Sequence, residues 1–336
     1  MSQEYKASII VPAYNSENTI EECLKSICLE ANNFVSEIIV IDDNSNDKTS
    51  DIVKDFKEIK LIKLEKNMGV GHVRNLGAKM AKYETLCYVD SDLVIGPNSI
   101  LNLLKKLYEN EKIGSVSAIQ DVANLNIKSW SSNFVCLKSC YGFDKIKKEL
   151  EFSACASEFC VINKKVLSQI GGWKSLRRAG GEEFDLGYKI NLSGKKNIKI
   201  RNASYKAFYA SLYSRFIKII DRTEKYIHIF LLKKKFDTPG SFATSNQALS
   251  CFFTFLILLT LLFSLILIKF SLLPVLIILF IAQLIVEGKF LLFAKKHFGF
   301  KMLFFSLLGI QIINIGILIG AGYFFLKLFN FKEKTL

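Results

Sequence analysis

Residues 84–93 read ETLCYVDSDL, a short apolar run that ends in two acids one residue apart. The run from Thr85 to Val89 is typical of a buried strand. Asp90 and Asp92 follow it, and alternate residues of an extended chain project to the same side. Two carboxylates placed in this way suit a hard divalent cation, Mg²⁺ or Mn²⁺, and the small Ser91 leaves room for a diphosphate. Such triplets are common in surface loops, so the meaning of this one depends on the rest of the chain.

The same strand-then-acid pattern occurs earlier, within a regular alternation of strands and helices. Alternation of this kind predicts an α/β fold with a mainly parallel, doubly wound sheet, which binds ligands at the carboxyl ends of its strands. Asp42 and Asp43 follow the second strand as Asp90 follows the fourth, so we expect both loops at that edge. Strands are expected at residues 7–11, 37–41, 59–64, 85–89, 114–119 and 157–162, and helices at 15–28, 49–56, 70–81 and 100–108.

Five motifs stand in order along the first part of the chain: SIIVPAYNSENTIEECLKSI, EIIVIDDNSNDKTSDIV, KNMGVGHVRNLGAKMA, ETLCYVDSDL and GGWKSLRRAGGEEFDLGYKI. Together they resemble the motifs of a family 2 glycosyltransferase with the GT-A fold, over about residues 6–200. The resemblance implies a Rossmann-like domain at residues 1–204, a nucleotide-sugar donor, a divalent metal and inversion at the anomeric carbon. It also implies a place in the synthesis of cell-envelope polysaccharides.

The resemblance gives individual residues a role at the donor site. Asp42 and Asp43 match an acidic pair, one of which is expected to bind the base or the ribose. Arg74 matches a basic residue near the nucleotide, while Asp90 and Asp92 match the motif that binds the ribose side and the metal-bound diphosphate. Plainer interpretations stay open, a strand-capping acid for Asp42 and a solvated helix arginine for Arg74. The loop that frames the base and ribose is matched by Pro12, Ala13, Tyr14 and Glu17.

A hydroxyl acceptor must lose its proton as it attacks the anomeric carbon, so the site needs a base. Members of the family usually carry Glu-Asp at the start of a helix here, and the Asp is the base. This chain has Glu182-Glu183, which makes Glu183 the expected base and Glu182 the alternative. Two acids at a helix N-terminus also stabilise the helix through its exposed N–H groups, a purely structural role. The Gln-x-x-Arg-Trp motif of processive members is absent from the base region, which favours a non-processive enzyme.

The chain has 336 residues and a formal charge of +14, and its apolar runs are concentrated near the C-terminus. Residues 205–240 predict a basic amphipathic helix suited to an anionic membrane surface, or else an ordinary solvated helix. Runs at about 251–268, 272–292 and 302–326 within residues 251–328 predict two or three membrane spans. The alternative to a third span is a re-entrant segment around Asn314. Lysines before the first run and after the second place the N-terminal domain in the cytoplasm, where its eight cysteines are expected to be reduced.

The combined prediction is a multi-pass enzyme of the cytoplasmic membrane. It is expected to move a sugar from a nucleotide-sugar donor, a UDP-sugar first, to a lipid-linked or glycan acceptor, with Mg²⁺ or Mn²⁺ as cofactor. Membrane lipids are the other expected partner, nucleic acid is not one, and homo-oligomerisation stays open. A bare polyprenyl phosphate is the alternative acceptor. A non-catalytic membrane scaffold and a transport component are the alternatives of other classes.

Overall fold

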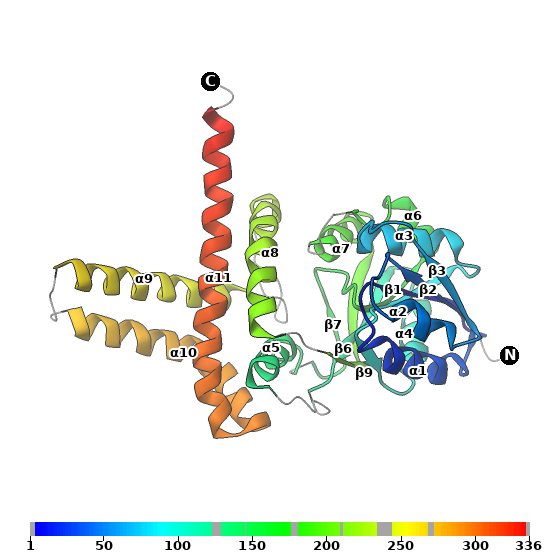
Figure 1. The fold of residues 1–336 in the computed structure, drawn as a ribbon, viewed down its shortest axis with the longest axis horizontal. Helices are drawn as coiled ribbons and strands as arrows, with labels where there is room; N and C mark the ends of the chain where they lie inside the picture. The colour runs from blue at the N-terminus through cyan, green and yellow to red at the C-terminus, as the bar shows by residue number, and fades with distance from the viewer. Residues whose placement is uncertain are drawn as a thin grey trace. The chain divides into compact units, whose positions relative to one another are not determined.

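The computed structural model describes residues 4–122, 129–144, 146–175, 181–208, 211–233, 244–267 and 272–333. The chain forms two compact units. The first comprises residues 1–124 and 145–208, and the second comprises residues 125–144 and 209–336. The chain therefore leaves the first unit in mid-sequence and returns to it before the C-terminal helices begin (Figure 1).

A nine-stranded sheet forms the centre of the first unit, in the order β3-β2-β1-β4-β8-β6-β9-β5, with β7 paired to β9. The half made of β3, β2, β1 and β4 is parallel throughout, as the strand–helix alternation predicts. Strands β8, β5 and β7 join antiparallel, so the complete sheet is mixed. The strands are β1 (Lys6–Ala13), β2 (Val35–Asp42), β3 (Ile59–Lys63), β4 (Thr85–Val89), β5 (Leu93–Ile95), β6 (Ile113–Gln120), β7 (Glu149–Glu151), β8 (Phe159–Asn163) and β9 (Lys196–Ala207).

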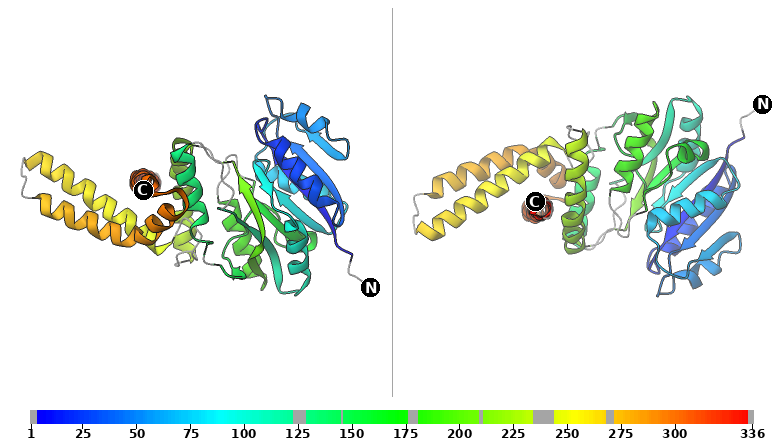
Figure 2. Two further views of the ribbon diagram at one scale, coloured as in Figure 1. Left: turned by 90° about the horizontal axis from the view of Figure 1, so that it is seen from below. Right: turned by 90° about the horizontal axis from the view of Figure 1, so that it is seen from above.

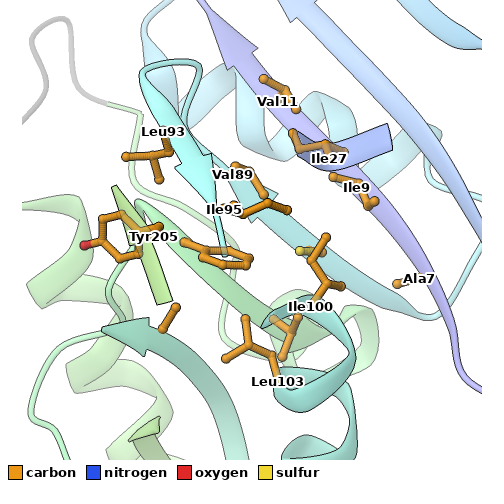
Figure 3. Close-up of a cluster of buried hydrophobic side chains, with 14 of the residues drawn as sticks. Ala7, Ile9, Val11, Ile27, Val89, Leu93, Ile95, Ile100, Leu103 and Tyr205 are labelled. Carbon is orange, nitrogen blue, oxygen red and sulfur yellow. The ribbon is translucent and has the colours of Figure 1, made fainter. Parts of the chain in front are cut away.

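Helices cover both faces of this sheet, which is why every residue of β1 after Lys6 is buried. Ile9 and Val11 point into a core cluster with α1 and α4, shown in Figure 3 together with Tyr205 of β9. Ile10, between them, points to the opposite face, where it packs with residues of α3, α6 and α7. The helices of this unit are α1 (Ile20–Ala31), α2 (Thr49–Lys54), α3 (Val70–Met80), α4 (Ser99–Tyr108), α6 (Lys164–Gln169) and α7 (Glu182–Leu192).

Two predicted helix boundaries are corrected by the structure. The first helix begins at Ile20 and not at residue 15, because Asn15 adopts a positive φ of 49° in the loop after β1. The basic amphipathic helix begins at Leu212 and not at residue 205, because β9 continues to Ala207. Residues 234–240 of that prediction lie outside the described residues. All eight cysteines are free thiols, as the sequence predicts.

The second unit is helical throughout its described part. Three of its helices are long and apolar enough to cross a membrane, over Ser245–Ile266, Leu273–Phe298 and Phe300–Leu328. Helices α9 and α10 run side by side as a hairpin, and α11 runs across this hairpin, as Figures 1 and 2 both show. The helices are α5 (Trp130–Cys140), α8 (Leu212–Lys233), α9 (Ser245–Leu267), α10 (Leu273–Phe298) and α11 (Phe300–Glu333).

Candidate active site

The carboxyl ends of β2, β1 and β4 lie next to one another, because these strands are parallel neighbours in the sheet. The loops after them are joined by hydrogen bonds. Ser16, in the loop after β1, donates its backbone N–H to Oγ1 of Thr49, the first residue of α2 (2.7 Å). Its hydroxyl lies 2.8 Å from that of Ser91, between the two acids after β4. The three loops predicted to bind a ligand therefore meet at one edge of the sheet.

The loop after β1 carries four of the predicted donor-site residues. Pro12 and Ala13 are the last two residues of β1, and both pair with β2. Tyr14, which follows them, is 48% exposed. The Glu17 carboxylate accepts the backbone N–H of Lys48 (3.1 Å), which ties this loop to the one after β2. Tyr14 thus offers an exposed aromatic ring at this edge of the sheet. Its backbone follows directly on residues that pair with β2.

Asp42 and Asp43 are both buried and both hold loops in shape. Asp42 accepts the backbone N–H of Ser45 (2.8 Å) and the hydroxyl of Ser50. Asp43 accepts two backbone N–H groups of residues 68–69, at 2.7 and 2.8 Å, just before α3. The strand-capping interpretation of Asp42 therefore describes its contacts. Each carboxylate oxygen has a second lone pair, so these bonds leave acceptor capacity for a ligand.

Arg74 connects the Asp-x-Asp loop to the start of α7. Its side chain is only 2% exposed, and its Nη2 donates to Oδ1 of Asp90 at 2.7 Å. Its Nη1 lies 3.7 Å from Oε1 of Glu182, and the guanidinium sits over the Trp173 ring, 4.9 Å from the centroid. Burial by itself lowers the pKa of Arg74, but the charges of Asp90 and Glu182 outweigh burial and raise it. The solvated-arginine interpretation is therefore wrong, because this cation is buried between two acids.

The Gly-Gly-Trp loop is held against α3, and it places Trp173 beside Arg74. Asn75 donates to the Trp173 carbonyl (2.8 Å) and accepts the Trp173 N–H (2.9 Å). Gly71, one turn earlier on α3, lies so close to the loop that a Cβ would come within 2.2 Å of the Lys174 carbonyl oxygen. A glycine and an asparagine on one helix therefore fix this wall of the site.

The two acids at the start of α7 occupy different environments. Glu182 is buried beside Arg74, whereas Glu183 is half-buried and accepts the backbone N–H of Gly181 (3.0 Å). The bond from Gly181 stabilises the carboxylate form of Glu183 at the helix N-terminus, the structural role that the sequence left open. Of the pair, Glu182 is the one that is committed to a buried cation.

The site thus combines the two aspartates of the Asp-x-Asp loop, a buried arginine and a pair of glutamates at the start of α7, and it can be compared with known proteins. The sequence profile of glycosyl transferase family 2 matches residues 8–171, the stretch that contains β1, β2, β4 and the Asp-x-Asp loop. Residues 8–171 belong to this family. The chain therefore contains a family 2 glycosyltransferase domain, and its first unit has a GT-A fold.

Individual relatives resemble parts of this glycosyltransferase. The poly-beta-1,6-N-acetyl-D-glucosamine synthase of Staphylococcus epidermidis is 28% identical over 171 residues, which are 49% of this chain and 41% of the relative. Glycosyltransferase GlyA of Streptococcus pneumoniae serotype 4 is 29% identical over 235 residues, 66% of this chain and 33% of the relative. The chain thus spans less than half the length of these two curated relatives.

One solved structure is similar to nearly all of this glycosyltransferase. It is the mannosyltransferase PcManGT from Pyrobaculum calidifontis in complex with GDP-Man and Mn²⁺, with a TM-score of 0.57 and 16% identity. The alignment covers 96% of this chain and 88% of that one. At this identity the likeness concerns the fold.

Asp90 and Asp92 are the residues of this glycosyltransferase that fit a divalent metal. Burial, followed by the charges of Asp92 and Glu158, raises the pKa of Asp90 against the opposing effect of Arg74, and a cation would relieve that repulsion. Among the described residues no group of three or more His, Cys, Asp or Glu side chains could enclose a metal ion. Mg²⁺ is commonly held by one or two carboxylates plus substrate phosphates, so this donor set is sufficient.

Sequence reasoning missed three residues beside the Asp-x-Asp loop. The Glu158 carbonyl accepts the backbone N–H of Asp90 (2.9 Å), and its carboxylate accepts the hydroxyl of Tyr205 (3.1 Å). The Lys199 ammonium is buried 3.8 Å from the same carboxylate. Burial lowers the pKa of Lys199, and the charge of Glu158 partly restores it. The available signal was an acid within the predicted strand 157–162, which is too common to single out.

Proposed function

We propose that this protein is a membrane-bound, inverting, non-processive glycosyltransferase. It moves a sugar from a nucleotide-sugar donor, a UDP-sugar first, to a hydroxyl of a lipid-linked or glycan acceptor. Membership of the family supports sugar transfer, and the three apolar helices support membrane association. The relative from Staphylococcus epidermidis, a polysaccharide synthase by name, supports a cell-envelope setting.

The single observation that carries this proposal is the position of Arg74. One guanidinium contacts both the acid that begins the Asp-x-Asp motif and the first acid of α7. The Asp-x-Asp loop, where the leaving diphosphate would bind, is thereby held at a fixed separation from the start of α7, where the acceptor would approach. Fixed separation of reacting groups is a major source of enzymatic rate enhancement.

On the donor side, Asp90 and Asp92 would hold Mg²⁺ or Mn²⁺ against the diphosphate. A bound cation supplies Lewis-acid stabilisation of the charge that develops on the departing diphosphate. The Nε and Nη1 atoms of Arg74 are buried without a hydrogen-bond acceptor among the described residues, so Arg74 acts on the donor through the Asp90 carboxylate that it holds. Tyr14 would lie against the base or ribose at the exposed rim.

On the acceptor side, Glu183 acts as the base. As the acceptor oxygen bonds to the anomeric carbon, its proton passes to a Glu183 carboxylate oxygen and the bond from that carbon to the diphosphate breaks. Attack opposite the leaving group inverts the configuration. Glu182 is the weaker candidate, because it is buried against Arg74 and serves as a partner of that cation.

The test measures release of nucleoside diphosphate by the full-length protein in detergent, with UDP-, GDP- and dTDP-sugars and a membrane lipid extract as acceptor source. We expect metal-dependent release from one donor, loss of that release in Asp92→Ala, and a decrease of about 10²–10⁴-fold in Glu183→Gln. Asp185→Asn is the matched control in the same helical turn, because Asp185 pairs along the helix with Lys189 (2.8 Å).

Two results would redirect the proposal. Full activity of Glu183→Gln with a lipid phosphate as acceptor would identify a polyprenyl-phosphate glycosyltransferase, because a phosphate oxygen needs no base. Absence of donor binding by the folded wild-type protein across the panel would contradict enzymatic transfer and favour the scaffold interpretation.

A further inference from the structure

Helix α11 is packed along α8, and α8 is too charged to lie in hydrocarbon. Six charged residues fall between Arg215 and Lys225 of α8. A Cβ on Gly316 would contact Phe216 of α8, and a Cβ on Gly320 would come within 2.5 Å of the Ile220 carbonyl oxygen. Charged side chains at the bilayer centre are strongly disfavoured. Helix α8 is therefore expected outside the hydrocarbon core, and the stretch of α11 from Gly316 onward lies at the same depth because it packs against α8.

The two helices stay together further toward the C-terminus. Lys327 of α11 forms an ion pair with Glu224 of α8, so the contact advances along both helices in the same direction. Helix α8 carries four basic and two acidic residues between Arg215 and Lys225, which suits the anionic surface of a membrane. A helix bound lengthwise to a surface helix shares its orientation.

The contacts of α11 with the α9–α10 hairpin are concentrated at one level. Within one turn of α11, Gln311 and Asn314 make hydrogen bonds to both hairpin helices. A helix that ran beside the hairpin would meet it at successive turns. Instead α11 crosses the hairpin, as Figure 1 shows, and Figure 2 shows α11 end-on while the hairpin is seen lengthwise. The hairpin partners at this crossing are Gln247, Thr254 and Gln283.

The two arms of the hairpin beyond this crossing expose apolar side chains on their outer surfaces. Leu262 and Leu265 of α9 and Ile277 and Ile281 of α10 are each at least half exposed. Helices of 23 and 26 residues are long enough to cross the hydrocarbon core of a bilayer, which takes about 20 residues. Each of the two helices therefore has the length of a membrane span, and α11 crosses them at Gln247–Thr254 of α9 and at Gln283 of α10, where the lipid-facing arms begin.

We infer that, of the described helices, only α9 and α10 cross the membrane, and that α8 and α11 lie together along the membrane surface on the side of the first unit. In this arrangement α8 covers one face of α11 and lipid covers the other, which accounts for the apolar character of α11. The lysines in the C-terminal part of α10 and those that follow it then stay on one side, in agreement with the positive-inside pattern. They are Lys289, Lys295, Lys296, Lys301, Lys327, Lys332 and Lys334.

The first test measures depth along α11 in the full-length protein. Spin labels are placed one at a time on exposed positions of α11 in vesicles of phosphatidylethanolamine and phosphatidylglycerol, and their accessibility to oxygen and to a nickel chelate is compared. We expect a similar, shallow depth at every position of α11. Depth that rises to a maximum in mid-helix and falls again would overturn the inference. The positions are Phe304, Leu308, Ile319, Tyr323 and Leu326, all exposed.

Helix α10 provides the matched control, because it is a span in either topology. Labels at Leu273, Ile277, Ile281 and Leu292, which are all exposed, must show the change of depth that a spanning helix gives. The native thiols contribute little background, since seven of the eight are buried. Burial, assisted by a hydrogen bond with Glu58, raises the pKa of the remaining one, Cys28, to about 11. The unsubstituted protein measures what background is left.

The second test measures sidedness in sealed vesicles with a maleimide that cannot cross lipid. Glu333→Cys, at the end of α11, is compared with Lys105→Cys in the first unit and Lys269→Cys between α9 and α10. We expect Glu333→Cys to react from the same side as Lys105→Cys, and Lys269→Cys from the other side. Reaction of Glu333→Cys together with Lys269→Cys would establish a third span and overturn the inference. Neither test uses enzymatic activity, so its result is independent of the proposed reaction.

Discussion

At the scale of single residues, the site depends on a planar cation that reaches two acids at once. Arg74 contacts Asp90 through Nη2 and approaches Glu182 through Nη1, while its flat face covers Trp173. A guanidinium can do all three because its donors form a rigid fork, whereas an ammonium is a compact point charge. The motif in the sequence identified Arg74 as a functional residue. Its partners are 16 and 108 positions away, and only the fold brings them together.

Replacing Arg74 by lysine tests this geometry. We expect the single ammonium of Arg74→Lys to lose the charged hydrogen bond to Asp90, which is worth about 1.5–3 kcal/mol. The free energy of unfolding should fall by that amount, and kcat/KM by about 10–100-fold if the same contact is used in the transition state. The measurements are denaturant unfolding and steady-state kinetics.

Lys79→Met is the matched control for this replacement. Lys79 lies on the same helix but is exposed, so its effect on stability should stay within about 0.5 kcal/mol. An Arg74→Lys protein as active and as stable as this control would contradict the role given to the guanidinium fork.

At the scale of elements, the sequence predicts the strands that alternate with helices and misses those that do not. The predicted strand 85–89 coincides with β4, and the second and third strands are right within two residues. The apolar runs of β2 and β4 are continuous because both faces of these strands are covered. Strands β5 and β7 have three residues each, too few for a period to be recognised. The long β9 alternates charged and apolar residues, and nothing local identifies its partners in the sheet.

Helix α5 is another element that sequence reasoning left unassigned. Its aromatic and apolar residues point to several neighbours, so no single apolar stripe marks it as a surface helix. Trp130 stacks on Phe305 of α11, and Phe134 meets Phe290 of α10 edge-on. These neighbours lie more than 150 positions away in the chain, and their contribution becomes visible only in the folded unit.

The packing of α8 on α11 gives a prediction at this scale. Gly320 allows close contact, because a Cβ there would meet the Ile220 carbonyl oxygen at 2.5 Å, and backbone cannot move aside easily. We expect Gly320→Ala to destabilise the helical unit by about 1–3 kcal/mol, the usual cost of overpacking. The measurement is the midpoint of thermal unfolding in detergent, followed by circular dichroism.

The control for this substitution is two residues away on the same helix. A Cβ on Gly322 would have no neighbour within 4 Å, so Gly322→Ala should be neutral or stabilising by roughly 0.5–1 kcal/mol, since alanine favours helix. Equal midpoints for the two variants would show that α8 and α11 do not pack closely in the protein.

At the scale of the whole molecule, the chain passes between its two units three times, near residues 124, 144 and 208. The glycosyltransferase unit is therefore interrupted by α5, which is a component of the helical unit. Within that unit Lys138 of α5 pairs with Glu287 of α10 at 3.2 Å. Residues 1–204, the domain that the motifs delimit, are consequently expected to carry a helix whose apolar surface needs the C-terminal helices.

A fragment of residues 1–208 tests this dependence. Phe134 and Leu137 of α5 are fully buried in the complete chain, and removal of α8 to α11 would expose them to water. We expect the fragment to elute as aggregates in size-exclusion chromatography and to bind a hydrophobic dye. The same fragment with Phe134→Gln and Leu137→Gln should elute as a monomer with little dye binding. In the full-length protein the same pair should instead destabilise the helical unit by several kcal/mol, at about 3–5 for the phenylalanine alone. A monomeric, dye-free fragment without substitutions would mean that α5 can detach from the helical unit and fold with the first.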